Sequence, residues 1–189
     1  MTKIKSLDER IRRSALLAVR ARVNLDLFAF LMWQSNLDRF EDALAERWNL
    51  FEFIRSANEH EFLARTVNLF APRKDTDNFP MLVKEAEATG AIDAAKCAAI
   101  SAQIAKAEPA LKVATRIRHK VVSHQDDTYT KPEIYNQVKP TLPMFIDLSD
   151  QSLKIASALC CARGFQAQAI FTAPIEQLEK MLAELQQNP

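Results

Sequence analysis

Apolar residues recur along most of this chain at the three- and four-residue spacings of amphipathic helices, and no stretch shows the period of two typical of strands. The pattern therefore predicts an all-α protein, with a single domain over residues 1–189 folded as a bundle of five to seven helices. Two long helices are expected first, over residues 6–33 and 38–69. A chain of 189 residues is long enough for one domain with a substantial core.

The two long helices have recognisable boundaries. Ser6 followed three residues later by Glu9 is the pattern of a capping box. Residues 34–38 are expected to form the turn between the two helices. The apolar run Leu27–Trp33 (LFAFLMW) is predicted to be fully buried, and Trp48 is placed on the inward face of the second helix.

Shorter helices are predicted in the rest of the chain, bounded by proline and glycine. The expected elements are a helix over 79–89 closed by Gly90, an alanine-rich helix over 91–107, a helix from Pro109 that ends near 126–130, a turn or broken helix over 131–143, a helix over 148–162 closed by Gly164, and a last helix after Pro174.

Composition excludes several classes of protein. Only two glycines occur and no Gly-rich phosphate loop is present, which argues against an NTPase or a dinucleotide-binding fold. The net charge of +1 gives no overall attraction for nucleic acid, so such affinity must come from a local patch. Three cysteines without a CxxC pair favour reduced thiols in a cytoplasmic protein. No signal-type or membrane-spanning run is present, and we expect no membrane partner, metal or cofactor.

One segment, Lys112–Asp127 (KVATRIRHKVVSHQDD), concentrates the candidate chemistry. It holds two of the three histidines, and no acidic residue interrupts it between Glu108 and Asp126. Side chains that can transfer protons and neutralise phosphate charge are gathered here, so a site is sought here first. The candidates are Lys112, Arg116, Arg118, His119, Lys120, His124, Asp126 and Asp127.

Regular helix geometry separates Arg118 from His124. Steps of 100° place these residues roughly 120° apart around the helix and about 9 Å apart along it, with His124 continuing the inward stripe of Ile117 and Val121. One chain could bring both side chains to one small ligand only by distorting the helix or stretching the arginine. Two chains related by a two-fold axis could complete each other's motif, so we expect a homodimer with the Arg118/Val122 side at its interface.

A purely structural interpretation of the same segment stays open. Basic residues favour helix C-termini, where the dipole and the free carbonyl groups attract positive charge. His124 could be a core histidine that bonds Asp126, Asp127 or a carbonyl group. Arg116 and Lys120 could form no more than a solvated basic rim. The third histidine, His60, lies among acidic neighbours and is expected to be a solvated or hydrogen-bonded surface side chain.

The segment Arg118–His124 (RHKVVSH) resembles the Arg-x(4–6)-His signature of the HEPN superfamily (higher eukaryotes and prokaryotes nucleotide-binding domains). The continuation RHKVVSHQD is similar to the AbiU-like abortive-infection branch, whose members tend to read R-N-K-x-x-A-H-x-D. Asp77–Gly90 resembles the loop and short helix that precede the motif helix in that branch. His119 replaces the commoner asparagine and Ser123 the commoner alanine. The likeness covers Asp77–Asp127, and elsewhere only the order of helices agrees.

This resemblance implies an HEPN-like fold and a metal-independent endoribonuclease of toxin or phage-defence type, in which the 2′-hydroxyl of the RNA is the nucleophile. His124 would then be the general acid or base, and Arg118 would bind the scissile phosphate and stabilise its developing charge. His119 could polarise the phosphate or complete the acid–base pair. Lys112, Arg116 and Lys120 would hold flanking phosphates, and Asp126 or Asp127 could orient a histidine. No metal or cofactor is implied.

Two other interpretations remain. HEPN-like domains include non-catalytic members, so the chain could be a helical module that dimerises or binds a nucleotide or a protein. It could also be a plain helical scaffold. The sequence does not identify the RNA, nor does it establish whether an antitoxin protein restrains the activity.

Overall fold

The computed structural model describes residues 6–73, 76–123, 131–166 and 172–187. Every element in these ranges is helical, which confirms the all-α prediction. The number of helices exceeds the expected five to seven. The elements are α1 (Leu7–Phe30), α2 (Gln34–Arg39), α3 (Glu41–Glu46), α4 (Trp48–Phe70), α5 (Phe79–Ala88), α6 (Ala94–Lys106), α7 (Glu108–Ile117), the π-helical segment η1 (Arg118–Ser123), α8 (Lys131–Val138), α9 (Leu142–Ala162) and α10 (Ala173–Gln187).

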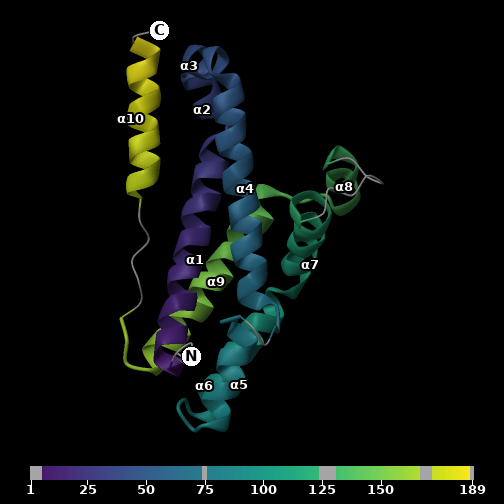
Figure 1. Cartoon of the computed structure of the whole chain (residues 1–189), viewed down its shortest axis with the longest axis vertical. Helices are drawn as coiled ribbons and strands as arrows, with labels where there is room; N and C mark the ends of the chain where they lie inside the picture. The colour runs from purple at the N-terminus through teal and green to yellow at the C-terminus, as the bar shows by residue number, and fades with distance from the viewer. Residues whose placement is uncertain (1–5, 74–75, 124–130, 167–171, 188–189) are drawn as a thin grey trace, which may run out of the picture.

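Three long helices, α1, α4 and α9, form the centre of an elongated bundle (Figure 1). Their inward faces share one apolar core with α5, α6, α7 and α8. Helix α10 packs against α1 and α3 at one end, where a second apolar cluster forms. Helices α7 and α8 lie beside α4 on the opposite side of the bundle from α10 (Figure 1). None of the helices in the described ranges is both long enough and apolar enough to cross a membrane.

The predicted helix boundaries at Ser6, Gly90 and Gly164 are confirmed. The backbone N–H of Ser6 donates to Glu9 Oε2 at 2.8 Å, and the backbone N–H of Glu9 donates to Ser6 Oγ at 3.3 Å, which completes the capping box. Gly90 and Gly164 follow the ends of α5 and α9 with φ angles of 65° and 72°. Residues that carry a side chain rarely adopt this left-handed backbone conformation, so glycine is favoured at both helix ends.

The turn expected at 34–38 and the single helix expected at 38–69 are wrong. Residues 34–39 form α2, and the second long helix is interrupted at Phe40 and Arg47, whose backbones leave the helical region. The two short helices fold the chain across the end of the bundle. This path buries Phe40, whose ring lies 6.3 Å from that of Phe30. Burial of one aromatic side chain therefore outweighs continuity of the helix.

The predicted burial of Leu27–Trp33 and Trp48 is also partly wrong. Helix α1 ends at Phe30, so the last residues of the apolar run extend past the packed part of the helix. Met32 is 44% exposed and Trp33 is 54% exposed. Trp48, the first residue of α4, is 54% exposed as well. Several large apolar side chains at this end of the bundle are thus open to solvent.

The proline-rich segment 131–143 is a broken helix, one of the two forms expected for it. Helix α8 ends at Val138, and Lys139 adopts a φ angle of 47°. Helix α9 then begins at Leu142, earlier than the predicted 148, because Pro143 occupies its first turn and the Thr141 side chain caps it. Proline in a first turn has no N–H to lose to the helix, so it favours the start of a helix instead of preventing one.

Candidate functional site

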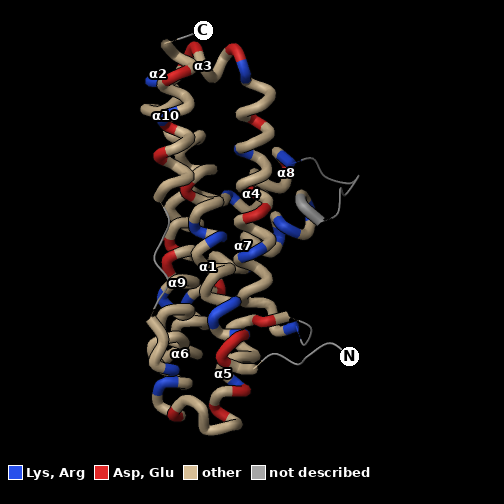
Figure 2. The backbone as a smooth tube through the Cα atoms, turned by 60° about the vertical axis from the view of Figure 1, so that its left-hand side comes forward, with Lys and Arg blue, Asp and Glu red and all other residues tan. Residues whose placement is uncertain are grey.

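The basic segment runs along α7 and continues into η1, beside α4 and α8. Lys and Arg residues lie along α7 and at the start of α8, and Figure 2 shows this charge on the α4 side of the molecule. The inward stripe is confirmed for Ile117, which is fully buried, and Val121 packs against the same core. The polar side chains of the basic segment therefore lie on its outer face.

The helix changes geometry at the first residue of the motif. α7 ends at Ile117, and the backbone N–H of Arg118 approaches the carbonyl groups of both Ala114 and Thr115. From Arg118 to Ser123 the chain is π-helical. A π-helix closes i→i+5 hydrogen bonds and holds more residues in each turn, so the regular 100° projection does not apply beyond Arg118. Such segments are rare and occur frequently at functional sites.

Arg118 is half-buried, and its guanidinium has no hydrogen bond or ion pair with any side chain in the described ranges. His119 is exposed beside it. An arginine donates up to five hydrogen bonds in a planar fork. As far as the described residues are concerned, this guanidinium can therefore accept an anionic ligand without first breaking an existing pair.

The flanking basic residues are on the surface. Lys112 pairs with Glu108 at 2.9 Å, with both side chains mostly exposed. Arg116 donates to the neutral side chain of Gln137 at 2.6 Å. Exposed pairs of this kind exchange readily with solvent and with other anions. Lys120 is half-buried in η1. These residues thus add positive charge beside Arg118, and within the described part of this segment only Arg118 combines partial burial with a guanidinium that has no partner there.

His124, Asp126 and Asp127 lie outside the described residues, so the predicted pairing of Arg118 with His124 and the predicted orienting carboxylates are not located. The helix end expected near 126–130 lies outside these ranges as well. Within the described residues, no three His, Cys, Asp or Glu side chains gather as a metal-binding group.

Sequence reasoning missed a buried polar cluster next to η1. Glu59 of α4 is 2% exposed, accepts a hydrogen bond from Lys131 Nζ at 2.8 Å on Oε2, and accepts another from the Tyr135 hydroxyl on Oε1. Burial and the adjacent carboxylate raise the pKa of Tyr135, so its hydroxyl stays protonated and remains a donor. The two helices that supply the cluster, α4 and α8, also contact η1.

One signal in the sequence could have revealed this cluster. Glu59 lies three and four residues before Phe62 and Leu63, so it belongs to the apolar stripe of α4. A carboxylate on such a stripe is either buried with partners or functional. The polar partners lie 72 and 76 residues further along the chain, and no local pattern identifies them.

The expected surface position of His60 is confirmed only in part, because the residue is half-buried. Its Nε2 atom is shielded from solvent and has no hydrogen-bond partner among the described residues. Burial lowers the pKa of His60, because the charged imidazolium loses hydration, and Lys131 lowers this pKa further while Glu59 opposes the shift. His60 is therefore held in its neutral form around pH 7.

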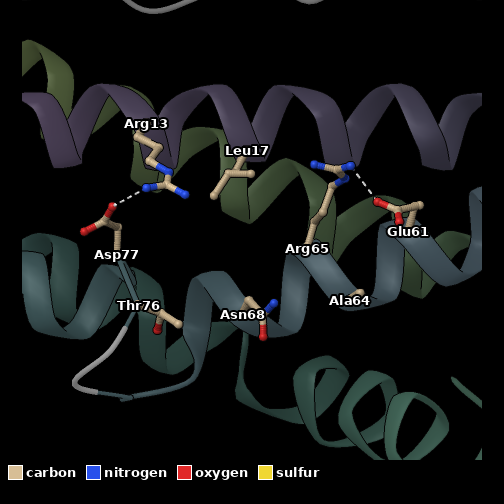
Figure 3. A pocket seen from close by; sticks show the side chains of 8 residues that line it. All are labelled: Arg13, Leu17, Glu61, Ala64, Arg65, Asn68, Thr76 and Asp77. Atoms are coloured by element: carbon tan, nitrogen blue, oxygen red, sulfur yellow. Dashed lines mark ion pairs between the residues drawn. The ribbon is translucent and has the colours of Figure 1, made fainter. Parts of the chain in front are cut away.

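A second polar region lies in a groove of about 370 Å³ between α1 and α4 (Figure 3). Arg13 and Arg65 point into the space between the two helices from opposite sides. Each guanidinium faces a carboxylate: Arg65 Nη2 lies 2.6 Å from Glu61 Oε2, and Arg13 Nη1 lies 3.8 Å from Asp77 Oδ2. The charges in this groove are already balanced, so it has no excess positive charge for binding a phosphate.

Comparison with known proteins adds no neighbour to this picture. No protein-family model, curated protein or solved structure matches the chain. The interpretation of the site therefore depends on its own residues.

Proposed function

We propose that this protein is a metal-independent endoribonuclease of defence or toxin type, with an HEPN-like fold and its site at the α7–η1 segment. Arg118 binds the scissile phosphate and stabilises the charge that develops on it. The 2′-hydroxyl of the RNA loses its proton and attacks the phosphorus, the bond to the 5′-oxygen of the next nucleotide breaks, and that oxygen takes up a proton, with His124 as the general acid or base. His119 polarises the phosphate or completes the acid–base pair, and Lys112, Arg116 and Lys120 hold flanking phosphates.

The observation that carries this proposal is that the Arg118 guanidinium has no hydrogen bond or ion pair among the described residues. Arg118 stands at the point where an α-helix becomes a π-helix, in a surface rich in positive charge. A purely structural arginine at a helix end would be expected to bond carbonyl groups or a carboxylate. Arg118 does neither with the described residues, so its charge is available for an anionic substrate.

Dimerisation is part of the proposal. The composite site requires the Arg118/Val122 side of one copy to face the second copy. A composite site requires the dimer at the concentrations at which cleavage is measured. Sedimentation equilibrium at micromolar protein should therefore give twice the chain mass of 21.4 kDa. A monomer under these conditions would contradict the composite site.

The nuclease activity is tested by incubating the purified full chain with mixed single-stranded RNA in excess EDTA. Cleavage should persist in EDTA and should disappear in Arg118→Ala and in His124→Ala. Arg65→Ala is the matched control, because this arginine is also half-buried but is already paired with Glu61. It should retain cleavage within about twofold of wild type. RNA binding without cleavage by the wild-type protein would indicate a non-catalytic module instead.

A further inference from the structure

A small pocket opens beside the buried Glu59 cluster. Its volume is about 280 Å³, and it lies between the end of α1, the middle of α4, α8 and the start of α9. Most of the lining is apolar, from Phe28, Met32, Leu142 and Phe145, and Glu59 and Tyr135 supply polar groups. The described structure thus combines flat aromatic walls with a buried carboxylate, which suits a planar ligand that donates hydrogen bonds.

The carboxylate retains capacity for further hydrogen bonds. An ionised carboxylate has about four acceptor positions on its two oxygens. Lys131 occupies one position on Oε2 and Tyr135 occupies one on Oε1. Among the described residues no other group bonds to Glu59, so one position on each oxygen is left there, and together they match a ligand that presents two neighbouring N–H groups.

The charge of the cluster selects a neutral ligand. The Lys131 ammonium group already lies 2.8 Å from Glu59 and balances its charge. A cationic amine or guanidinium entering the pocket would be repelled by Lys131 and would gain no unpaired negative charge. A neutral donor suffers no such repulsion.

From this geometry we infer that the pocket binds a guanine base, with Glu59 accepting from its N1–H and its exocyclic N2–H₂. Among the four RNA bases only guanine presents two adjacent donors on its Watson–Crick edge. Adenine and cytosine place an acceptor beside their amino group, and uracil has one donor between two acceptors. Unpaired bases in RNA are commonly bound by aromatic stacking together with hydrogen bonds to this edge.

The assignment rests on the proposed RNA substrate and makes it more specific. Helices α4 and α8, which supply Glu59 and Tyr135, both contact η1. The helices that supply these two residues thus also pack against the segment that carries Arg118, and the proposal runs the strand of the bound guanine from the pocket toward that segment. Cleavage should favour sites next to an unpaired guanine.

Calorimetric titration of the full chain with nucleosides tests the pocket without a phosphodiester. Guanosine should bind at least about tenfold more tightly than adenosine, cytidine or uridine, and inosine, which lacks the N2 amino group, should lie between. Equal affinity for all nucleosides, absence of guanosine binding up to millimolar concentration, or tighter binding of benzylamine would overturn the assignment.

Substitutions in the pocket test whether guanosine binds there. Glu59→Gln should weaken guanosine binding at least tenfold, whereas Glu61→Gln, a substitution at an exposed position of the same helix, should leave it unchanged. Met32→Trp should also block binding, because Met32 is a partly exposed residue of the pocket lining and its replacement does not disturb the Glu59 hydrogen bonds. Unaltered guanosine binding in Met32→Trp would place the ligand elsewhere, even if Glu59→Gln failed to fold.

The two proposals fail in different ways. Arg118→Ala should bind guanosine as wild type does, because a nucleoside has no phosphate. Guanosine binding by a wild-type protein that cuts no RNA would contradict the nuclease and leave the pocket intact. RNA cleavage without any preference for guanosine would contradict the pocket and leave the nuclease intact.

Discussion

Helix α4 borders two polar regions that differ in how their charges are satisfied. Glu61 and Glu59 lie two residues apart, so their side chains leave the helix about 200° apart. On the Glu61 side, Arg65 and Arg13 both face carboxylates (Figure 3). On the Glu59 side, the carboxylate is buried between Lys131 and Tyr135, while the nearby Arg118 guanidinium has no partner among the described residues. The number of charged residues does not distinguish the two regions. What differs is whether each charged side chain has a partner among the described residues.

The largest difference between the two regions is expected when one arginine in each is replaced by lysine. Arg118→Lys keeps the charge but loses the planar fork that contacts two phosphate oxygens. Single-turnover cleavage of RNA should fall by about 100-fold, in the range seen when one donor to transition-state charge is removed. Arg65→Lys should change the rate by less than about twofold. Equal losses in the two variants would show that both arginines serve the fold.

Stability should separate the two glutamates of α4. Glu59→Ala leaves the buried Tyr135 hydroxyl without its acceptor and opens a cavity, so the free energy of unfolding should fall by about 2–3 kcal/mol. Glu61→Ala removes an exposed i,i+4 ion pair and should cost less than about 0.5 kcal/mol. Urea denaturation followed by circular dichroism measures both values. A similar small loss in the two variants would mean that the Glu59 cluster contributes little to the fold.

Salt dependence should distinguish the flanking cations. If Lys112 and Arg116 contact phosphates, removing either one should lower the slope of log affinity against log salt by roughly 0.7 for single-stranded RNA. Arg13→Ala, on the groove side, should leave the slope unchanged. Fluorescence anisotropy with a labelled RNA at several potassium chloride concentrations gives these slopes. An unchanged slope in all three variants would show that Lys112 and Arg116 do not contact RNA phosphates.

The smallest expected effect concerns His60. Its pKa is lowered in the folded protein, so near and below its ordinary value the unfolded chain binds more protons than the folded one. His60 therefore favours the folded state fully above that ordinary value near 6.5, and this contribution is lost as the pH falls below it. The stability of His60→Gln should thus vary less between pH 7 and pH 5 than that of wild type. Parallel pH dependences in denaturant titrations would contradict the burial of this imidazole.

The sequence is sufficient for those elements whose causes are local. The capping box at Ser6 and the glycine helix ends depend on neighbouring residues, and they are observed as predicted. The break at Phe40 coincides with burial of its ring beside that of Phe30, and helical spacing alone could not reveal it. The exposure of Trp48 is likewise set by where the bundle ends.

The sequence supplies the residue types of the candidate site but not their arrangement. Residue chemistry alone is enough to single out Arg118, His119 and the basic rim, because proton transfer and phosphate binding require these side chains. The π-helical turn follows from the hydrogen bonding of the backbone, and no residue type specifies it. Glu59, Lys131 and Tyr135 meet only after folding, since more than 70 residues separate the glutamate from either partner.

The composite site is tested most directly by mixing two inactive variants. Arg118→Ala and His124→Ala proteins are purified separately, mixed in equal amounts under conditions that exchange subunits, and assayed for RNA cleavage in EDTA. If each site takes its arginine from one copy and its histidine from the other, half of the dimers regain one intact site. Activity should then return to roughly a quarter of wild type. A mixture as inactive as either variant alone, despite proven exchange of subunits, would contradict a site shared between two chains.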